Sequence, residues 1–141
     1  MTSYGISLFG DLGVTYGGEP IPVSGSRQRS LLALLAINPN LTLSPDRIIE
    51  ELWGDEPPGR PTNALRFHLS KLRSQVTPDD GDRNALIETQ PGGYALTIDP
   101  ENIDTVQYAV LVERAETLLG LDPETASDTI AQAEALVSGQ P

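Results

Sequence analysis

Residues 60–76 read RPTNALRFHLSKLRSQV, the stretch of the chain with the most distinctive pattern of apolar and cationic residues. Apolar side chains recur here every three or four residues, which is the spacing of one buried side of an α-helix: Leu65, Leu69, Leu72 and Val76. The opposite side of the helix carries small polar groups and one aromatic ring: Asn63, Phe67, Ser70 and Ser74. The stretch therefore predicts a helix from Thr62 to Val76 with one packed side and one outward side.

The charge of this stretch is entirely positive, with four cations and no acid between residues 60 and 75: Arg60, Arg66, Lys71 and Arg73. Cations at the margins of a helix can reach DNA phosphates while a small polar centre approaches base edges in the major groove. An exposed ring such as Phe67 can contact a thymine methyl group. His68 falls near the buried side, so we expect it to pack or to bond a phosphate rather than to act in catalysis.

Taken alone, the pattern fits the solvated side of an ordinary amphipathic helix better, because most basic helix faces have no further role. Phe67 argues against that interpretation, since a phenyl ring directly opposite the buried stripe needs a reason to be exposed. The elements on either side decide between the two interpretations.

Short runs that alternate apolar and polar residues precede this helix at 6–9, 14–16 and 21–23, and they predict an antiparallel meander with glycine turns. Two further helices follow the meander, one capped by Ser26 and one by Ser44 with Pro45 in its first turn. After the basic helix, residues 86–89 and 94–98 predict a hairpin whose turn is 90–93. Sheet, three helices and hairpin, in this order, form a winged helix-turn-helix with an added N-terminal sheet, which is an α+β fold.

Two more helices are predicted at 104–119 and 123–137, and they share no strand signal with the first 98 residues. We place a domain boundary near Pro100, with a winged-helix domain over 1–100 and a helix pair over 101–141. The net charge of −11 is uneven: 8 basic residues face 11 acidic ones up to Leu96, whereas Arg114 faces 9 acidic ones thereafter. The basic stripe can bind phosphate in such a chain, although the acidic tail should weaken long-range steering.

Several kinds of site have no support in the sequence. The chain has no cysteine and one histidine, which excludes thiolate and paired-histidine metal sites. No glycine-rich stretch has the context of a phosphate loop, and no serine lies in a nucleophile motif. No apolar run approaches the ~20 residues that span a bilayer. We expect a cytoplasmic protein that is not an enzyme, needs no metal or cofactor and has no membrane partner.

Four segments, in this order and spacing, resemble the antibiotic regulatory protein (SARP) family of OmpR-type winged-helix regulators: RQRSLLALL at 27–35, IIEELWG at 48–54, NALRFHLSKLR at 63–73 and PGGY at 91–94. Residues 103–137 are similar to the opening of the bacterial transcriptional activator domain, a TPR-like helical array. That array is longer than the segment present here, so we expect the chain to be the truncated N-terminal part of a longer regulator.

The resemblance implies a transcription activator that binds direct repeats of double-stranded DNA and contacts RNA polymerase. Because the acidic tail predicts weak binding by one copy, we also expect two copies, a homodimer on DNA, at tandem sites. Matching the positions of the family's recognition helix and wing gives the expected DNA-binding residues, to which we add Arg60, the cation just before the helix. They are Arg60, Asn63, Arg66, Phe67, His68, Ser70, Lys71, Arg73, Thr89 and Gln90. Relatives often carry an arginine in the wing, where Gln90 adds no charge for a narrow minor groove. Ser70 likewise stands where some relatives have a cation.

The sequence is also compatible with two other functions. A winged helix that has lost DNA binding can serve as a protein-interaction module, which the overall acidity, Gln90 and Phe67 favour. The unit can also be a regulatory domain of a larger enzyme or ATPase. Salt-dependent binding to duplex DNA separates the interaction module from a regulator.

Overall fold

The computed structural model describes residues 3–78 and 81–138, so the centre of the polar connection predicted at 77–82 lies outside the described residues. In chain order the elements are β1 (Tyr4–Ser7), β2 (Gly13–Tyr16), β3 (Glu19–Ile21), α1 (Ser26–Ala36), α2 (Pro45–Trp53), α3 (Pro61–Val76), β4 (Ile87–Gln90), β5 (Gly93–Leu96), the 3-10 helix η1 (Pro100–Asn102), α4 (Asp104–Leu118) and α5 (Pro123–Ser138). This order of sheet, three helices, hairpin and helix pair confirms the predicted α+β winged-helix architecture.

The first sheet is an antiparallel meander in the order β1-β2-β3. Its second turn needs glycine, because Gly17 and Gly18 have positive φ angles of 61° and 83°. Tyr4 and Val14 point inward and are buried. The Tyr4 hydroxyl donates a hydrogen bond of 2.8 Å to the carbonyl oxygen of Val76, which ties the sheet to the C-terminal end of α3.

The helices α1, α2 and α3 pack with this sheet around one apolar core. α1 contributes three leucines that have no exposed surface: Leu31, Leu32 and Leu35. At the start of α2 the Ser44 hydroxyl accepts a hydrogen bond of 3.2 Å from the Arg47 N–H, as the predicted cap requires. At the start of α1 the capping position is Gly25 instead of the predicted Ser26, and no side chain within 3–78 and 81–138 caps that helix.

The hairpin of β4 and β5 forms the predicted wing, and Leu43 pairs with the other edge of β5. Leu43 and Tyr94 exchange two backbone hydrogen bonds of 2.8 and 3.0 Å. The close approach depends on Gly93, because a Cβ atom there would lie 1.9 Å from the Leu43 carbonyl oxygen. The wing is thereby fastened to the segment that joins α1 to α2.

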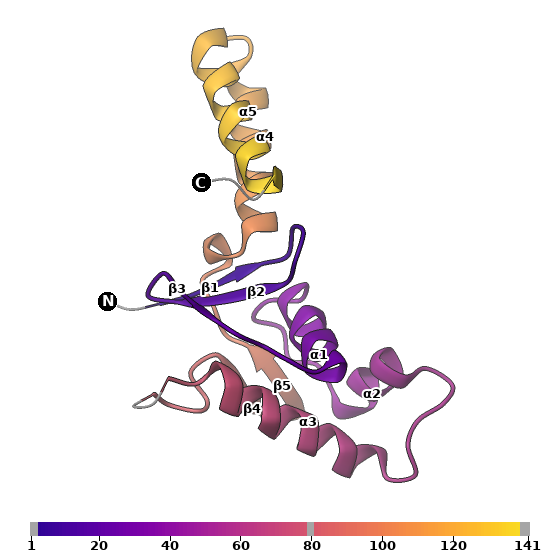
Figure 1. The fold of residues 1–141 in the computed structure, drawn as a ribbon. Coiled ribbons are helices and arrows are strands. Elements are labelled where there is room, and N and C mark those ends of the chain that lie inside the picture. Colours follow the sequence, from indigo (N-terminus) through magenta and orange to yellow (C-terminus); the bar gives the residue numbers. More distant parts are fainter. Residues whose placement is uncertain (1–2, 79–80, 139–141) are drawn as a thin grey trace.

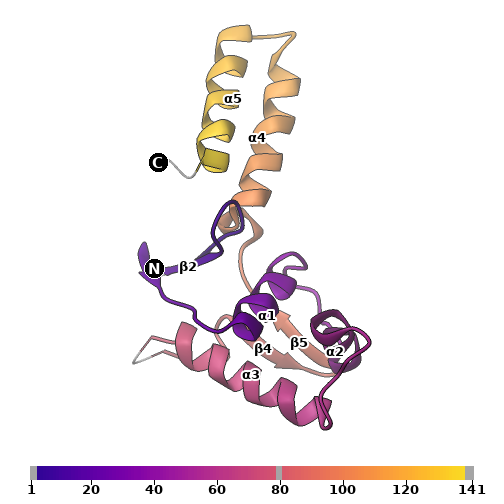
Figure 2. The ribbon, with the colours of Figure 1, turned by 45° about the vertical axis from the view of Figure 1, so that its right-hand side comes forward.

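The helix pair of α4 and α5 projects from the N-terminal sheet, away from α3 (Figure 1 and Figure 2). Its first residues are built into that sheet. Ile103 forms a parallel bridge with Ile6, and its side chain is fully buried in the same core. The Asp104 carboxylate accepts hydrogen bonds from the backbone N–H groups of Leu8 and Phe9, at 2.8 and 3.2 Å. The chain therefore contacts the winged helix beyond the boundary expected near residue 100.

Candidate nucleic-acid interface

Helix α3 has the two-sided character that its sequence predicts. The buried side consists of Leu65, Leu69, Leu72 and Val76. The residues of the opposite side are all exposed and are here called the α3 outer face: Asn63, Arg66, Phe67, Ser70, Lys71 and Ser74. α3 lies along one border of the molecule, so this face is turned away from the helices that cover its buried side (Figure 1).

The α3 outer face combines cations with an exposed ring. Arg66 and Lys71 are exposed on it, and Arg60 is exposed at the residue before the helix. Phe67 is 61% exposed, and its ring stands edge-on to that of His68 at 5.3 Å. Because residues 60–75 contain no acid, nothing on α3 itself offsets the positive charge. A polar, cationic helix side of this kind suits contact with the edges and phosphates of duplex DNA.

His68 lies at the inner margin of this face, half-buried between α3 and α1. Its Nδ1 accepts a hydrogen bond of 2.8 Å from the Gln28 amide, so the proton of the neutral ring resides on Nε2. Burial lowers the pKa of His68 below its ordinary 6.5, and the charges of Arg27 and Lys71 lower it further. The side chain is therefore a neutral donor near pH 7.

The guanidinium of Arg73 is turned toward the wing and not toward the outer face, where the sequence places it. Its Nε and Nη2 donate hydrogen bonds of 3.1 and 2.8 Å to the carbonyl oxygen of Ile87. Nη2 also donates to the Thr89 hydroxyl at 2.8 Å, and the group lies 5.8 Å from the centre of the Tyr94 ring. Partial burial lowers the pKa of Arg73, and the nearby charge of Arg83 contributes in the same direction. Arg73 thus joins α3 to the wing.

The two predicted wing residues also have partners inside the protein. The Thr89 hydroxyl accepts the hydrogen bond from Arg73, although its side chain is exposed. The Gln90 side-chain oxygen accepts a hydrogen bond of 2.5 Å from the Thr42 hydroxyl in the link between α1 and α2. The wing tip therefore presents polar groups beside α3 but no cation.

Arg83 belongs to this region although it was not among the predicted site residues. It follows α3 in a loop, and its side chain returns to α3, where Nη1 donates a hydrogen bond of 3.0 Å to the Ser74 hydroxyl. The sequence gives no cue to this position, because Arg83 follows several acidic residues in a segment without periodicity. Only the tertiary fold brings it to the α3 outer face.

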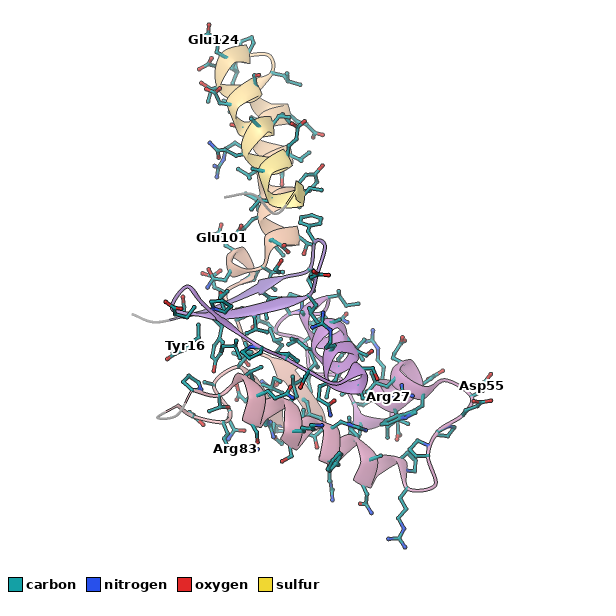
Figure 3. The ribbon with its side chains drawn as sticks, viewed as in Figure 1. Tyr16, Arg27, Asp55, Arg83, Glu101 and Glu124 are labelled. Atoms are coloured by element: carbon teal, nitrogen blue, oxygen red, sulfur yellow. The ribbon has the colours of Figure 1, made fainter. Side chains whose placement is uncertain are left out.

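The acidic helix pair of α4 and α5 extends away from α3. Figure 3 places Glu124, at the start of α5, at the opposite end of the molecule from Arg83. Because exposed charges are screened beyond roughly 10 Å in ordinary buffer, acidic side chains at the far end of the helix pair act only weakly on the cations of α3. A net charge of −11 is thus compatible with an anion-binding surface at one end.

Among residues 3–78 and 81–138, no group of three or more histidine, cysteine or acidic side chains is placed to hold a metal ion. In the same part of the chain, no helix has the length and apolarity to cross a bilayer. The α3 outer face, with exposed cations and no acid, is therefore the candidate binding surface of the described residues.

Comparison with known proteins connects this surface to a family. Residues 18–96, which contain α1, α2, α3 and the wing, match the family model described as "Transcriptional regulatory protein, C terminal". The chain belongs to this family. The elements outside the match are β1, β2, η1, α4 and α5.

Relatives extend the match over most of the chain. The transcriptional regulator RedD of Streptomyces coelicolor is 28% identical over 127 residues, which are 89% of this chain and 36% of RedD. The transcriptional regulatory protein EmbR of Mycobacterium tuberculosis is 34% identical over 95 residues, 67% of this chain and 24% of EmbR. The chain therefore spans only about a third or less of these relatives.

A solved structure of Mycobacterium tuberculosis EmbR, in complex with a low-affinity phosphopeptide, has the same fold as this chain with a TM-score of 0.88 and 26% identity. The superposition covers 96% of this chain and 36% of the EmbR chain, so it includes the helix pair as well as the winged helix. The resemblance to the SARP regulators is confirmed by these relatives together with the family match.

Proposed function

We propose that this chain is the DNA-binding part of a transcription regulator, with α3 in the major groove and the wing over the neighbouring backbone. The observation that carries the proposal is the α3 outer face, an exposed polar helix side without acids and with Arg66 and Lys71 at its margins. Asn63, Phe67 and Ser70 are then the groups that approach base edges. Arg60 directly precedes α3, and Thr89 lies in the wing beside Arg73.

His68 supports the proposal because its neutral ring carries the proton on Nε2. With Nδ1 accepting from Gln28, its Nε2–H is oriented as a neutral donor, which suits a bond to a phosphate oxygen. Arg73 and Gln90 act indirectly in this proposal, because their side chains are bonded to the wing and to Thr42.

We further infer the partners of the whole regulator, of which this chain is a portion. It is a transcription activator of the cytoplasm without enzymatic activity, which binds direct repeats and contacts RNA polymerase. Each copy offers few phosphate contacts, so a homodimer on tandem sites would bind far more tightly than one copy.

The test is a titration of mixed-sequence duplex DNA at several salt concentrations with the parent chain and two variants, Lys71→Ala and Arg114→Ala. Both variants remove one exposed cation, the first from α3 and the second from α4. We expect Lys71→Ala to weaken binding and to flatten the dependence of log K on log salt by about 0.9, the contribution of one phosphate contact. Arg114→Ala should match the parent.

Equal, negligible binding by all three proteins would contradict the proposal. A protein-interaction module would then be favoured, because Phe67 adds apolar surface to α3 and the inward position of Arg73 removes one charge from it.

A further inference from the structure

Arg83 lies between α3 and β4 in the sequence, yet its guanidinium rests on the α3 outer face. Nη1 donates to the Ser74 hydroxyl at 3.0 Å, and Nη2 donates to the carbonyl and hydroxyl oxygens of Ser70 at 3.2 and 3.4 Å. In Figure 3 the Arg83 side chain lies beside α3 on the side opposite α1. This is the side that carries Phe67 and Asn63 toward the N-terminal end of the helix.

Hydrogen bonds to Ser70 and Ser74 hold the Arg83 guanidinium in place and leave some of its N–H donors available. Ser74 donates its own hydroxyl proton to the Ser70 carbonyl at 3.0 Å, which leaves its oxygen free to accept from Arg83. The neighbouring carboxylate of Asp82 accepts from the Asn84 N–H. A guanidinium has five N–H donors, and the bonds to Ser70 and Ser74 engage at most three of them, so at least two stay available within the described structure.

Arg83 also adds a positive charge to the C-terminal half of the α3 outer face, where α3 itself has few cations. Positions 70 and 74 are serines, and Arg73 is committed to the Ile87 carbonyl beneath the wing. Lys71 would otherwise be the sole cation of the C-terminal half of the α3 outer face. Arg83 is exposed there and lies close enough for its charge to act on Arg73.

We propose that Arg83 binds a phosphate of the DNA backbone and forms part of the DNA-binding surface together with Lys71. A guanidinium suits this task because its planar group can donate to α3 and keep further N–H donors, with its full positive charge, for a phosphate oxygen. Its hydrogen bonds to α3 order it before DNA arrives, so less side-chain entropy is lost on binding. The inference rests on the proposed function, and it adds a residue from outside the recognition helix.

The experiment measures binding of the full chain to a labelled mixed-sequence duplex of about 20 base pairs, two helical turns, over a range of salt concentrations. The variants are Arg83→Gln, Arg83→Lys and the matched control Arg114→Gln, which removes an equally exposed cation from α4. We expect Arg83→Gln to lower affinity roughly 3- to 10-fold at low salt and to reduce the salt slope by about 0.9. Arg83→Lys should keep the slope, because the charge remains, and Arg114→Gln should bind as the parent does.

The outcomes separate this inference from the proposed function. If Lys71→Ala weakens binding while Arg83→Gln keeps the parent slope, the role of Arg83 is overturned and DNA binding stands. If the parent itself does not bind, both fail. Thermal midpoints of all variants are measured alongside: an Arg83→Gln protein that binds weakly with an unchanged slope has lost local structure and not a phosphate contact, which also overturns the inference.

Discussion

The only histidine of the chain, His68, lies where α3 meets α1, and its surroundings keep it neutral. On one side the Gln28 amide donates to Nδ1, and on the other the Trp53 ring lies 6.0 Å away between His68 and Arg27. A proton on Nδ1 would face the Gln28 donor and two nearby cations, Arg27 and Lys71. The folded protein therefore opposes protonation of this ring.

We expect the fold to lose stability in mild acid through His68. The folded pKa lies below 6.5 and the unfolded chain titrates near 6.5, so between these values the unfolded state binds more protons. Stability is thus complete above the unfolded pKa and declines as the pH falls through 6.5 toward the folded pKa. NMR titration of the single imidazole should give the lowered pKa directly, and urea midpoints at about pH 7.5 and about pH 5.5 should show the decline.

His68→Gln is the control for this titration, because it removes the titrating ring and keeps a polar side chain. Its urea midpoint should change less between the same two pH values. A histidine pKa at or above 6.5 in the folded parent would show that the Gln28 bond and the two cations do not govern the ring.

At the scale of elements, the wing and α3 form one unit through side chains and not only through the core. Arg73 reaches from the last turns of α3 to the Ile87 carbonyl and the Thr89 hydroxyl, and Gln90 is bonded to Thr42 before α2. The orientation of the wing relative to α3 therefore depends on a small set of polar contacts. In the proposed complex, a wing fixed in this way would meet the DNA backbone at a set distance from α3.

We expect Arg73→Ala to destabilise the protein by about 1–3 kcal/mol, because it removes the charged donor of the buried Ile87 carbonyl. Arg66→Ala, at an exposed position of the same helix, should change stability by less than about 0.5 kcal/mol. Urea unfolding of both variants gives the comparison. Coincident midpoints for Arg73→Ala and the parent would mean that the core alone positions the wing.

The positions of helices and strands could be predicted from the sequence because they depend on periodicity and local capping, as at Leu65, Leu69 and Ser44. Side-chain partners depend on contacts between segments that are distant in the chain. Arg73 follows the same charge pattern as Lys71, and only the folded hairpin supplies the carbonyl that draws it inward. Arg83 shows the reverse case, a loop residue that tertiary structure brings to α3.

At the scale of the whole molecule, the acidic helix pair lies apart from the cationic α3, but its first residues pack into the apolar core of the winged helix. The helix pair extends from the end of the molecule opposite α3 (Figure 1). Ile103, at its start, packs in the same core as the N-terminal sheet. The Phe9 and Tyr108 rings meet edge-on at 5.6 Å beside the Asp104 hydrogen bonds, so α4 leaves the sheet in a defined direction. We propose residues 1–100 and 101–141 as two functional units. The contacts of Ile103, Asp104 and Tyr108 with the N-terminal sheet and its first turn, here called the joint, connect them.

We expect this joint to make the stability of the winged helix depend on the helix pair. Ile103 is fully buried among winged-helix residues, so Ile103→Ala should cost about 2–5 kcal/mol through lost burial and a cavity. Trp53 is the only tryptophan and lies in α2, so its fluorescence reports unfolding of the winged helix although the change is made after η1. Leu121→Ala, at a position 79% exposed between α4 and α5, is the control and should leave the transition unchanged. If the Trp53 transition of Ile103→Ala coincides with that of the parent, the winged helix folds without the joint, and the helix pair is attached only by its linker.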